Sequence, residues 1–227
     1  MQPYYQDEST TIYHGRWQDA LPHLAGELLV TDPPYGTGGW RREATGAGSD
    51  PSGTLVVEDW DDGGVDWLEA FAPKVDAVLT FWPPARTSAL LVAANAAGLT
   101  KHRALYLHKP DPKPQVGGRI AWSMEPIWAL SRDGFQLYGG MDIWRQSTPR
   151  RGQPDATGHP YQKPLGVMRW LLAKTRAQSV IDPFMGSGTT LRAAKDLGLR
   201  AVGCEQEERW CEVAVRRLAQ LSLPLAV

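Results

Sequence analysis

The chain has 227 residues, of which 42% are hydrophobic, and its formal net charge is -1. It can bury one substantial core and lies within the size range of a single α/β domain, so we expect one domain over 1–227. Its two cysteines, Cys204 and Cys211, lack CxxC spacing and paired histidines, which argues against a disulfide framework and a zinc site. No run approaches the ~18 apolar residues of a membrane span, and the N-terminus lacks a basic region followed by an apolar stretch. A soluble, cytoplasmic protein without a bound metal is therefore expected.

Charge is unevenly distributed along the chain. Residues 1–100 carry a net charge of -9, residues 101–176 carry +8, and residues 177–227 carry none. Such asymmetry can mark a surface that binds a polyanion on a protein that is nearly neutral overall. Ordinary solvated surfaces are the alternative, because charges that are distant in sequence can intermix on the folded surface.

Short apolar runs alternate with helical patterns, an order that predicts a mostly parallel sheet with helices on both faces. Apolar residues recur at spacings of three and four in the expected helices, and Gly98 and Gly198 lie where two of them should end. The expected strands are 11–14, 27–31, 76–81, 103–107, 126–130, 179–181 and 201–204. The expected helices are 86–98, 164–176, 188–197 and 206–220.

Two long segments show no such pattern and are predicted to be loops. Residues 36–64 are rich in Gly, Ser, Asp and Thr, and residues 139–158 combine Gly and Pro with several arginines. A loop longer than ~15 residues in a compact domain is usually functional or disordered. Because 36–64 directly follows a candidate active-site motif, we expect it to form a mobile lid.

A glycine-rich turn follows the strand at 179–181. Residues 182–188 read Asp-Pro-Phe-Met-Gly-Ser-Gly and lead into a helix that begins with two threonines. Glycines let the backbone approach a ligand closely, and the helix N-terminus offers free N–H donors suited to a carboxylate. Glu205 ends the next strand, where an acid could accept both ribose hydroxyls of an adenosine. A phosphate-binding P-loop is disfavoured because no Gly-Lys-Ser/Thr follows, and a plain structural turn is the alternative.

A second motif, Asp32-Pro33-Pro34-Tyr35, ends the strand at 27–31. Its prolines stiffen the turn and keep the preceding residues extended, so backbone carbonyls can face a ligand. A carboxylate and a carbonyl can accept the two N–H groups of an exocyclic amine, and the tyrosine ring offers a surface on which a planar base can stack. The motif therefore predicts an acceptor site for such an amine. A proline-stiffened surface turn is the alternative.

Together, these motifs resemble those of the S-adenosylmethionine-dependent DNA amino-methyltransferases. The acceptor motif precedes the cofactor motif, which matches the family's permuted beta class, and residues 159–164, His-Pro-Tyr-Gln-Lys-Pro, resemble its further cofactor motif. The resemblance covers most of the chain, from about 12 to 218. It implies a Rossmann-like, seven-stranded, mostly parallel sheet with one antiparallel strand, in circularly permuted order. Donor and acceptor pockets would lie side by side at the carboxyl ends of the strands.

The resemblance also implies roles for individual residues. Asp32 would accept from the target amine, the Pro33 carbonyl would take the second hydrogen, Pro34 would stiffen the turn and Tyr35 would stack on a base flipped from the duplex. The methyl group would move in line from sulfonium to nitrogen without a metal or a covalent intermediate. Residues implied to bind S-adenosylmethionine are Lys163, Pro164, Asp182, Phe184, Gly186, Ser187, Gly188, Thr189 and Glu205, with Lys163 and Pro164 near the methionine moiety.

The expected partner is double-stranded DNA, and the resemblance places the protein in DNA methylation and restriction-modification as a monomer or homodimer. The family usually has a sizeable target-recognition region, whereas this chain offers only the loops at 36–64 and 139–158. Arg145, Arg150 and Arg151 are therefore candidates for contacts to phosphates or guanine edges. Ordinary solvation of a loop is the alternative for these arginines.

The leading target is the N6 amine of adenine, because an acidic first residue in the acceptor motif is more frequent among adenine enzymes of the family. The N4 amine of cytosine fits the same pocket and is the alternative. RNA and protein amide methyltransferases usually place the cofactor turn first, so the order disfavours them. A non-catalytic nucleic-acid-binding module with a vestigial cofactor pocket is a further alternative.

Overall fold

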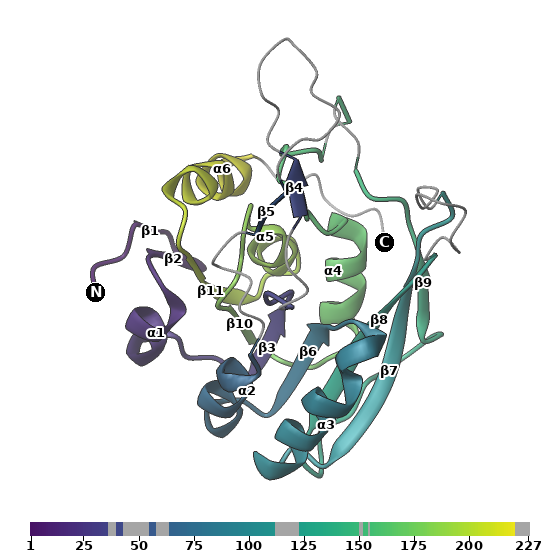
Figure 1. Ribbon diagram of the computed structural model, residues 1–227. Coiled ribbons are helices and arrows are strands. Elements are labelled where there is room, and N and C mark those ends of the chain that lie inside the picture. The colour runs from purple at the N-terminus through teal and green to yellow at the C-terminus, as the bar shows by residue number, and fades with distance from the viewer. Residues whose placement is uncertain are drawn as a thin grey trace.

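The computed structural model describes residues 1–35, 40–42, 55–57, 64–111, 123–149, 152–153 and 155–220. Within these residues, a mixed sheet is covered by helices on both faces (Figure 1). The predicted α/β architecture is therefore confirmed. Arg150 and Arg151 lie outside the described residues, as does most of the predicted lid at 36–64.

The main sheet has nine strands within the described part of the chain, rather than the seven that were expected. All seven predicted strands are present, and the two additional ones, β1 and β9, are short edge strands of 2 and 3 residues. Runs this short carry no recognisable alternation, which is why the sequence did not reveal them. In spatial order the strands are β1 (Tyr5–Gln6), β2 (Thr10–His14), β11 (Arg200–Glu205), β10 (Ser179–Asp182), β3 (Leu28–Thr31), β6 (Ala77–Phe81), β8 (Met124–Ser131), β7 (Lys101–His108) and β9 (Ile143–Arg145).

The five neighbouring strands β2, β11, β10, β3 and β6 run parallel to one another. Strand β8 is antiparallel to both of its neighbours, β6 and β7. The single antiparallel strand expected among the seven is thus β8. At the edges, β1 pairs antiparallel with β2, and β9 pairs parallel with β7. The parallel strands place their carboxyl ends along one edge of the sheet.

The helices form two layers. On one face, α1 (Trp17–Ala20), α2 (Asp66–Phe71) and α3 (Thr87–Ala96) pack on the sheet, together with the short 3-10 turns Leu21–His23, Ala72–Lys74 and Pro84–Arg86. On the other face lie α4 (Leu165–Ala173), α5 (Thr189–Asp196) and α6 (Glu208–Ala219). The four predicted helices are confirmed as α3 to α6, and α1 and α2 are additional, with 4 and 6 residues.

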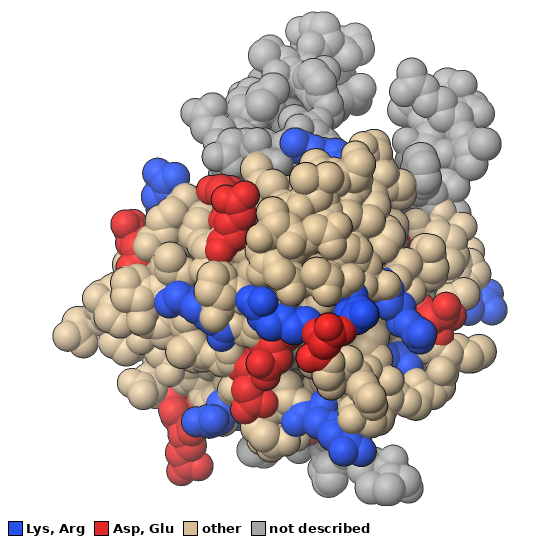
Figure 2. Space-filling model, turned by 90° about the horizontal axis from the view of Figure 1, so that it is seen from below, with Lys and Arg blue, Asp and Glu red and all other residues tan. Residues whose placement is uncertain are grey.

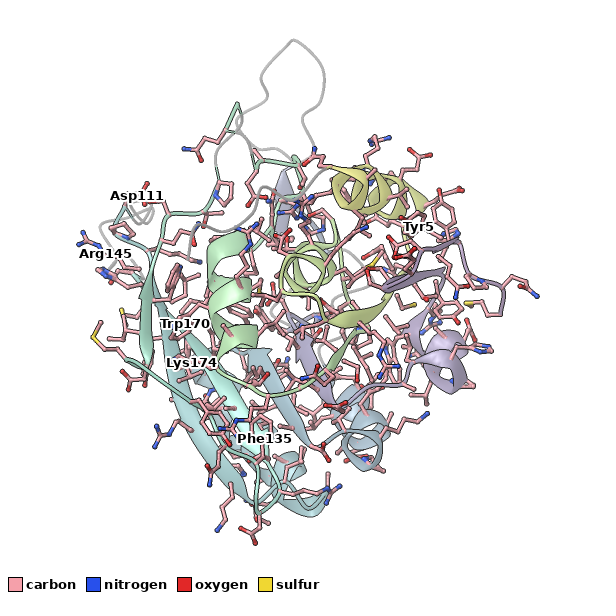
Figure 3. The ribbon with its side chains drawn as sticks, turned by 180° about the vertical axis from the view of Figure 1, so that it is seen from behind. Tyr5, Asp111, Phe135, Arg145, Trp170 and Lys174 are labelled. Carbon is pink, nitrogen blue, oxygen red and sulfur yellow. The ribbon has the colours of Figure 1, made fainter. Side chains whose placement is uncertain are left out.

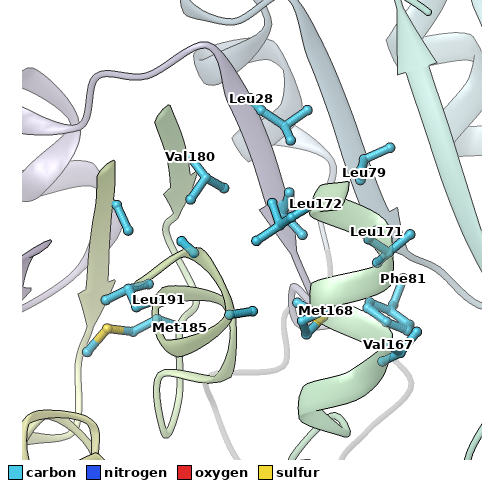
Figure 4. Close-up of a cluster of buried hydrophobic side chains, with 14 of the residues drawn as sticks. Leu28, Leu79, Phe81, Val167, Met168, Leu171, Leu172, Val180, Met185 and Leu191 are labelled. Atoms are coloured by element: carbon cyan, nitrogen blue, oxygen red, sulfur yellow. The ribbon is translucent and has the colours of Figure 1, made fainter. Parts of the chain in front are cut away.

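The central strands are buried on both faces, as their unbroken apolar runs require. In β3, Leu28 and Val30 pack toward α4 and α5, whereas Leu29 packs toward the opposite layer. Figure 4 shows the first of these clusters, in which side chains of α4 reach the sheet. Each fully buried leucine of this kind contributes about 1.5–3 kcal/mol. The centre of the sheet is therefore a firm base for the loops that follow its strands.

Two predicted loop segments contain strands. Residues Trp40–Arg42 (β4) and Leu55–Val57 (β5) pair antiparallel inside 36–64. Strand β9 lies inside 139–158 and extends the sheet beyond β7. Within the described residues, the structure contains no helix long and apolar enough to cross a membrane.

The chain leaves β3 and β10 toward opposite faces of the sheet. The connection from β3 to β6 contains α2, whereas the connection from β10 to β11 contains α5 on the other face. Neighbouring strands whose connections diverge in this way leave a crevice at their carboxyl ends, where ligands bind in open α/β sheets. Both motifs singled out in the sequence follow these two strands.

Candidate active site

A cavity of about 780 Å³ opens at the carboxyl ends of β3 and β10. This volume is typical of sites for small molecules and cofactors. Both motifs border it, although they lie about 150 residues apart in the chain. The predicted site residues that line it are Asp32, Pro33, Pro34, Tyr35, Lys163, Asp182, Phe184, Gly186, Ser187, Thr189 and Glu205. Pro164, Gly188 and Arg145 are not among the lining residues.

On the acceptor side, both carboxylate oxygens of Asp32 have protein partners. The Tyr35 hydroxyl donates to Oδ1, and the ammonium of Lys163 lies 2.7 Å from Oδ2. Burial raises the pKa of Asp32, an effect that the Lys163 charge opposes. The carboxylate is therefore held in a defined orientation at the border of the cavity.

The strand next to the acceptor motif holds that motif in place. The ring of Trp82, which follows β6, and the ring of Tyr35 pack nearly perpendicular to each other, with a centroid distance of 5.7 Å. Its indole N–H donates to the carbonyl of Arg86 at 2.9 Å, and the Arg86 guanidinium donates to the carbonyl of Tyr35. These contacts fix the end of the proline turn on the side away from the cofactor motif.

On the cofactor side, the turn between β10 and α5 depends on two glycines in the left-handed region. Gly186 has φ 50° and Gly188 has φ 74°, conformations that other residues adopt only with strain. Asp182 anchors the turn: its Oδ1 accepts from the Phe184 N–H at 3.1 Å, and its Oδ2 accepts from the Thr190 hydroxyl at 2.6 Å. Burial raises the pKa of Asp182 to about 7, against the effect of these hydrogen bonds.

Glu205 ends β11 and connects the two parts of the predicted cofactor site. Its carboxylate accepts from the backbone N–H of Gly186 at 3.1 Å and from that of Glu207 at 2.8 Å. A carboxylate offers about four lone-pair positions, so capacity remains for ribose hydroxyls. Burial raises the pKa of Glu205. Phe184 lies at the same end of the cavity, with the rings of Trp17 and Trp67 at 6.4 and 6.5 Å.

The segment 155–164 forms one wall of the cavity and is tied to the cofactor turn by charge. Arg217 of α6 donates to the carboxylate of Asp155 and, at 2.7 Å, to the hydroxyl of Thr189. Within the segment, the Gln162 side chain accepts from the backbone of Thr157 at 2.8 Å. The ring of His159 packs on Trp210 at 4.5 Å. The third motif is thus built into the wall rather than extended into solvent.

Several lining residues were not singled out as site residues in the sequence. Glu125 and Lys109 extend the acceptor side, and His159 and Trp210 cover the cofactor side. His159 is the first residue of the third motif, 159–164, but it was not among the predicted site residues. The signal that could have found Glu125 is its charge, since it lies at the start of the otherwise apolar strand β8.

Arg145, predicted to contact DNA, is exposed on strand β9 at the outer edge of the sheet (Figure 3). It is not among the residues that line the cavity. The face seen from below carries basic and acidic side chains intermixed (Figure 2), so the charge asymmetry of the sequence does not segregate by sign on that face.

This strand order, with helices on both faces, places a glycine turn, an acid on the next strand and an acceptor motif around the crevice at the ends of β3 and β10. Together these features define an S-adenosylmethionine-dependent methyltransferase. The profile of a family described as DNA methylase, the N6/N4 methyltransferases, matches residues 131–216. The Type II methyltransferase M2.DpnII of Streptococcus pneumoniae is 39% identical, over 95% of this chain and 92% of that protein. The Type II methyltransferase M2.LlaDCHI of Lactococcus lactis subsp. cremoris is 27% identical, over 95% and 91%. The chain therefore belongs to the DNA methylase family.

Solved structures share the fold. A complex of M1.HpyAVI with S-adenosylmethionine has a TM-score of 0.70 at 21% identity, covering 93% of this chain and 100% of that one. The PvuII DNA methyltransferase, described as cytosine-N4-specific, has a TM-score of 0.70 at 17% identity, covering 98% and 90%. Identities this low support the fold and leave the target base open.

The family's methyl donor is S-adenosylmethionine, and the cavity fits it. Gly186 leaves the turn without a side chain where an added Cβ would lie 3.1 Å from His159 Nε2 on the cavity wall, and Glu205 retains acceptor capacity beside it. The cavity is also large enough for a nucleoside cofactor next to a base.

Proposed function

We propose that this DNA methyltransferase transfers its methyl group to the exocyclic N6 amine of adenine, on a base turned out of the duplex. The observation that carries the proposal is the position of Asp32, whose carboxylate borders the same cavity as the glycine turn and Glu205. The acidic first residue of the acceptor motif supports adenine, since it is more frequent among adenine enzymes of the family. Asp32 and the carbonyl of Pro33 take the two N–H groups of the amine.

The chain's own residues orient the amine. With both hydrogens held, the nitrogen lone pair turns out of conjugation with the ring and toward the donor methyl. Pro34 stiffens the turn that presents these acceptors, and Tyr35 stacks on the base. The Tyr35 hydroxyl bonds to Asp32 in the structure without DNA, so stacking requires the ring to leave or share that hydrogen bond.

Bound S-adenosylmethionine supplies an electrophilic methyl: the new N–C bond forms as the sulfonium S–C bond breaks and its electron pair stays on sulfur. The nitrogen becomes positive in this step, and the negative charge of Asp32 stabilises it. The nitrogen then releases one proton to water. Asp32 acts as a hydrogen-bond acceptor and electrostatic partner, since the weakly basic amine needs no strong general base before transfer.

The cofactor assignments are kept as proposals, although the ammonium of Lys163 contacts Asp32 and Glu125 on the acceptor side. Glu205 accepts from the ribose, the turn residues shape the pocket, and the helix N-terminus at Thr189 faces the methionine carboxylate. The residues proposed to hold the donor are Lys163, Pro164, Asp182, Phe184, Gly186, Ser187, Gly188, Thr189 and Glu205. Arg145, Arg150 and Arg151 are proposed to contact DNA phosphates or base edges.

Methylation of the N4 amine of cytosine is the second candidate. Both amines present two N–H groups, so both satisfy the same pair of acceptors. A solved relative of the same fold is described as cytosine-N4-specific, which keeps this target in consideration.

The test is to incubate the protein with mixed-sequence duplex DNA and isotopically labelled S-adenosylmethionine, digest to nucleosides and identify the labelled species by mass spectrometry. Labelled N6-methyladenine is expected. Labelled N4-methylcytosine would instead identify cytosine as the target base and leave the proposed mechanism unchanged. The matched variant Asp32→Ala should lose methyl transfer but retain cofactor binding by calorimetry. Cofactor binding without label on DNA would overturn the proposal in favour of a binding module.

A further inference from the structure

A group of charged side chains leads from the acceptor motif toward β8. Lys163 Nζ lies 2.7 Å from Asp32 Oδ2 and 2.7 Å from Glu125 Oε1. The side chains of Asp32, Lys163 and Glu125 are largely buried, with exposed fractions of 19%, 12% and 19%. One buried cation is thus shared by two carboxylates, of which only Asp32 belongs to the acceptor motif.

Lys163 and Glu125 are both held in their charged forms. Against the effect of burial, Asp32 and Glu125 raise the pKa of Lys163, so its ammonium stays protonated. Also against burial, the charge of Lys163 and then that of Lys109 lower the pKa of Glu125 to about 2. The ring of Phe81 lies under the ammonium at 4.6 Å from its centroid. Lys163 therefore acts as a held cation and not as a proton acceptor.

We propose that Glu125 is a positioning residue for methyl transfer, which holds the Lys163 ammonium and keeps the group of Asp32, Lys163 and Glu125 net negative. This inference rests on the proposed function. Without Glu125, the ammonium would pair with Asp32 alone, and the pair would be neutral. A target nitrogen that becomes positive during transfer is stabilised by net negative charge in a site of low dielectric. The neutral amine before transfer gains little, so Glu125 acts on the rate and not on binding.

Lys109 does not cancel this effect. Its ammonium lies 2.7 Å from Glu125 Oε2, whereas Lys163 contacts Oε1, and the Lys109 side chain is 31% exposed. Solvent screens an exposed charge much more than a buried one. Lys109 therefore compensates the cost of burying Glu125 while leaving the negative charge effective at Asp32.

The test separates charge from shape by comparing Glu125→Gln with Glu125→Asp. Glutamine keeps the length and removes the charge, whereas aspartate keeps the charge and shortens the side chain. At an effective dielectric of about 20, one unit charge within about 8 Å changes a rate by about 10- to 100-fold, which is the loss of kcat expected for Glu125→Gln. The KM for duplex DNA and the Kd for S-adenosylmethionine should stay within about twofold of wild type. Glu125→Asp should retain more activity than Glu125→Gln, and the reverse order would overturn the inference.

A second measurement does not depend on activity. Besides Lys163, the groups that face Asp32 among the described residues are the hydroxyl of Tyr35, Glu125 and the Asp182 carboxyl, and the charge of Glu125 raises the pKa of Asp32. Carboxyl NMR titration of the protein without DNA should therefore give a lower pKa for Asp32 in Glu125→Gln than in wild type. An unshifted titration would contradict the inference.

A double variant covers the case in which Glu125→Gln does not fold. Glu125→Gln with Lys109→Met removes both members of the outer pair and leaves no unpaired charge there. It should fold and still lose kcat, and a wild-type rate would count against the role of Glu125. If the wild type methylates no DNA, the proposed function is overturned. If the wild type is active and Glu125→Gln has the same kcat, only this inference is overturned.

Discussion

The hydroxyl of Thr31 donates to Asp182 Oδ1 at 2.9 Å, although the two residues lie 151 positions apart. Thr31 is the last residue of β3 and Asp182 the last of β10, so this hydrogen bond joins the strand before the acceptor motif to the strand before the cofactor turn. Both side chains are buried. This buried side-chain contact therefore adds to the backbone pairing of β3 with β10 in joining the two halves of the site.

Replacing Thr31 by valine keeps the shape and removes the donor. A buried hydrogen bond to a charged group contributes about 1.5–3 kcal/mol, so Thr31→Val should lose that much stability at pH 8, where Asp182 is largely ionised. The affinity for S-adenosylmethionine should also fall, because Asp182 anchors the turn through the Phe184 N–H. Urea unfolding and calorimetry measure the two effects.

Thr80 provides the matched control. It pairs with Thr31 in the sheet register and is equally buried, but its hydroxyl donates only to the neighbouring carbonyl of Phe81. Thr80→Val should leave cofactor affinity unchanged. Equal losses of affinity in the two variants would show that the Thr31 contact has no specific role.

Asp182 itself predicts a pH dependence of stability. Burial raises its pKa to about 7 from the ordinary value of 3.8, so between these values the folded state holds a proton that the unfolded state has lost. Its contribution to stability is thus fully present below about pH 4 and is lost as the pH rises through about 7. Relative to Asp182→Asn, the wild type should become progressively less stable over this window. Urea unfolding of both proteins at a series of pH values tests this, and parallel curves would contradict it.

The long elements of the fold were predictable, and the short ones were not. The seven longer strands and helices α3 to α6 carry enough residues for an apolar run or a repeated spacing of three and four to emerge. By contrast, β1 has 2 residues and α1 has 4, so neither is long enough for its period to repeat. Their positions are set by contacts with the rest of the sheet, which no local pattern encodes.

The same distinction holds within the site. The two motifs could be placed at one sheet edge because parallel strands align their carboxyl ends. Glu125 could not be placed, because its partner Lys163 lies 38 residues away in the chain. The two side chains come together because β8, which carries Glu125, lies between β6 and β7 in the sheet, and no local pattern predicts that order. Lys163 was expected near the methionine moiety, but the contacts of its ammonium are with carboxylates on the acceptor side.

The two cysteines should be unreactive in the native protein. Both are buried, and burial raises the pKa of each thiol to about 12, so the nucleophilic thiolate is scarce at pH 8. Cys204 also donates to the carbonyl of Gly15 at 3.1 Å. A colorimetric thiol reagent should therefore label neither cysteine before unfolding and both in urea. Rapid labelling of one thiol in the native state would show that strand β11 or helix α6 opens readily.

Gly188 should be the least replaceable glycine of the cofactor turn. An added Cβ would lie 2.7 Å from the Cβ of Ala214 in α6, and the residue has φ 74°. Gly198 is the matched control, with φ 71° and open space within 4 Å of an added Cβ. Left-handed strain costs about 1–2 kcal/mol at either position, and overpacking adds about 1–3 kcal/mol at Gly188 alone. Because the clash would move α5 from α6, Gly188→Ala should also weaken cofactor binding, whereas Gly198→Ala should not. Urea unfolding and calorimetry of both variants give these quantities, and similar losses for the two would mean that the turn adapts to a side chain beside α6.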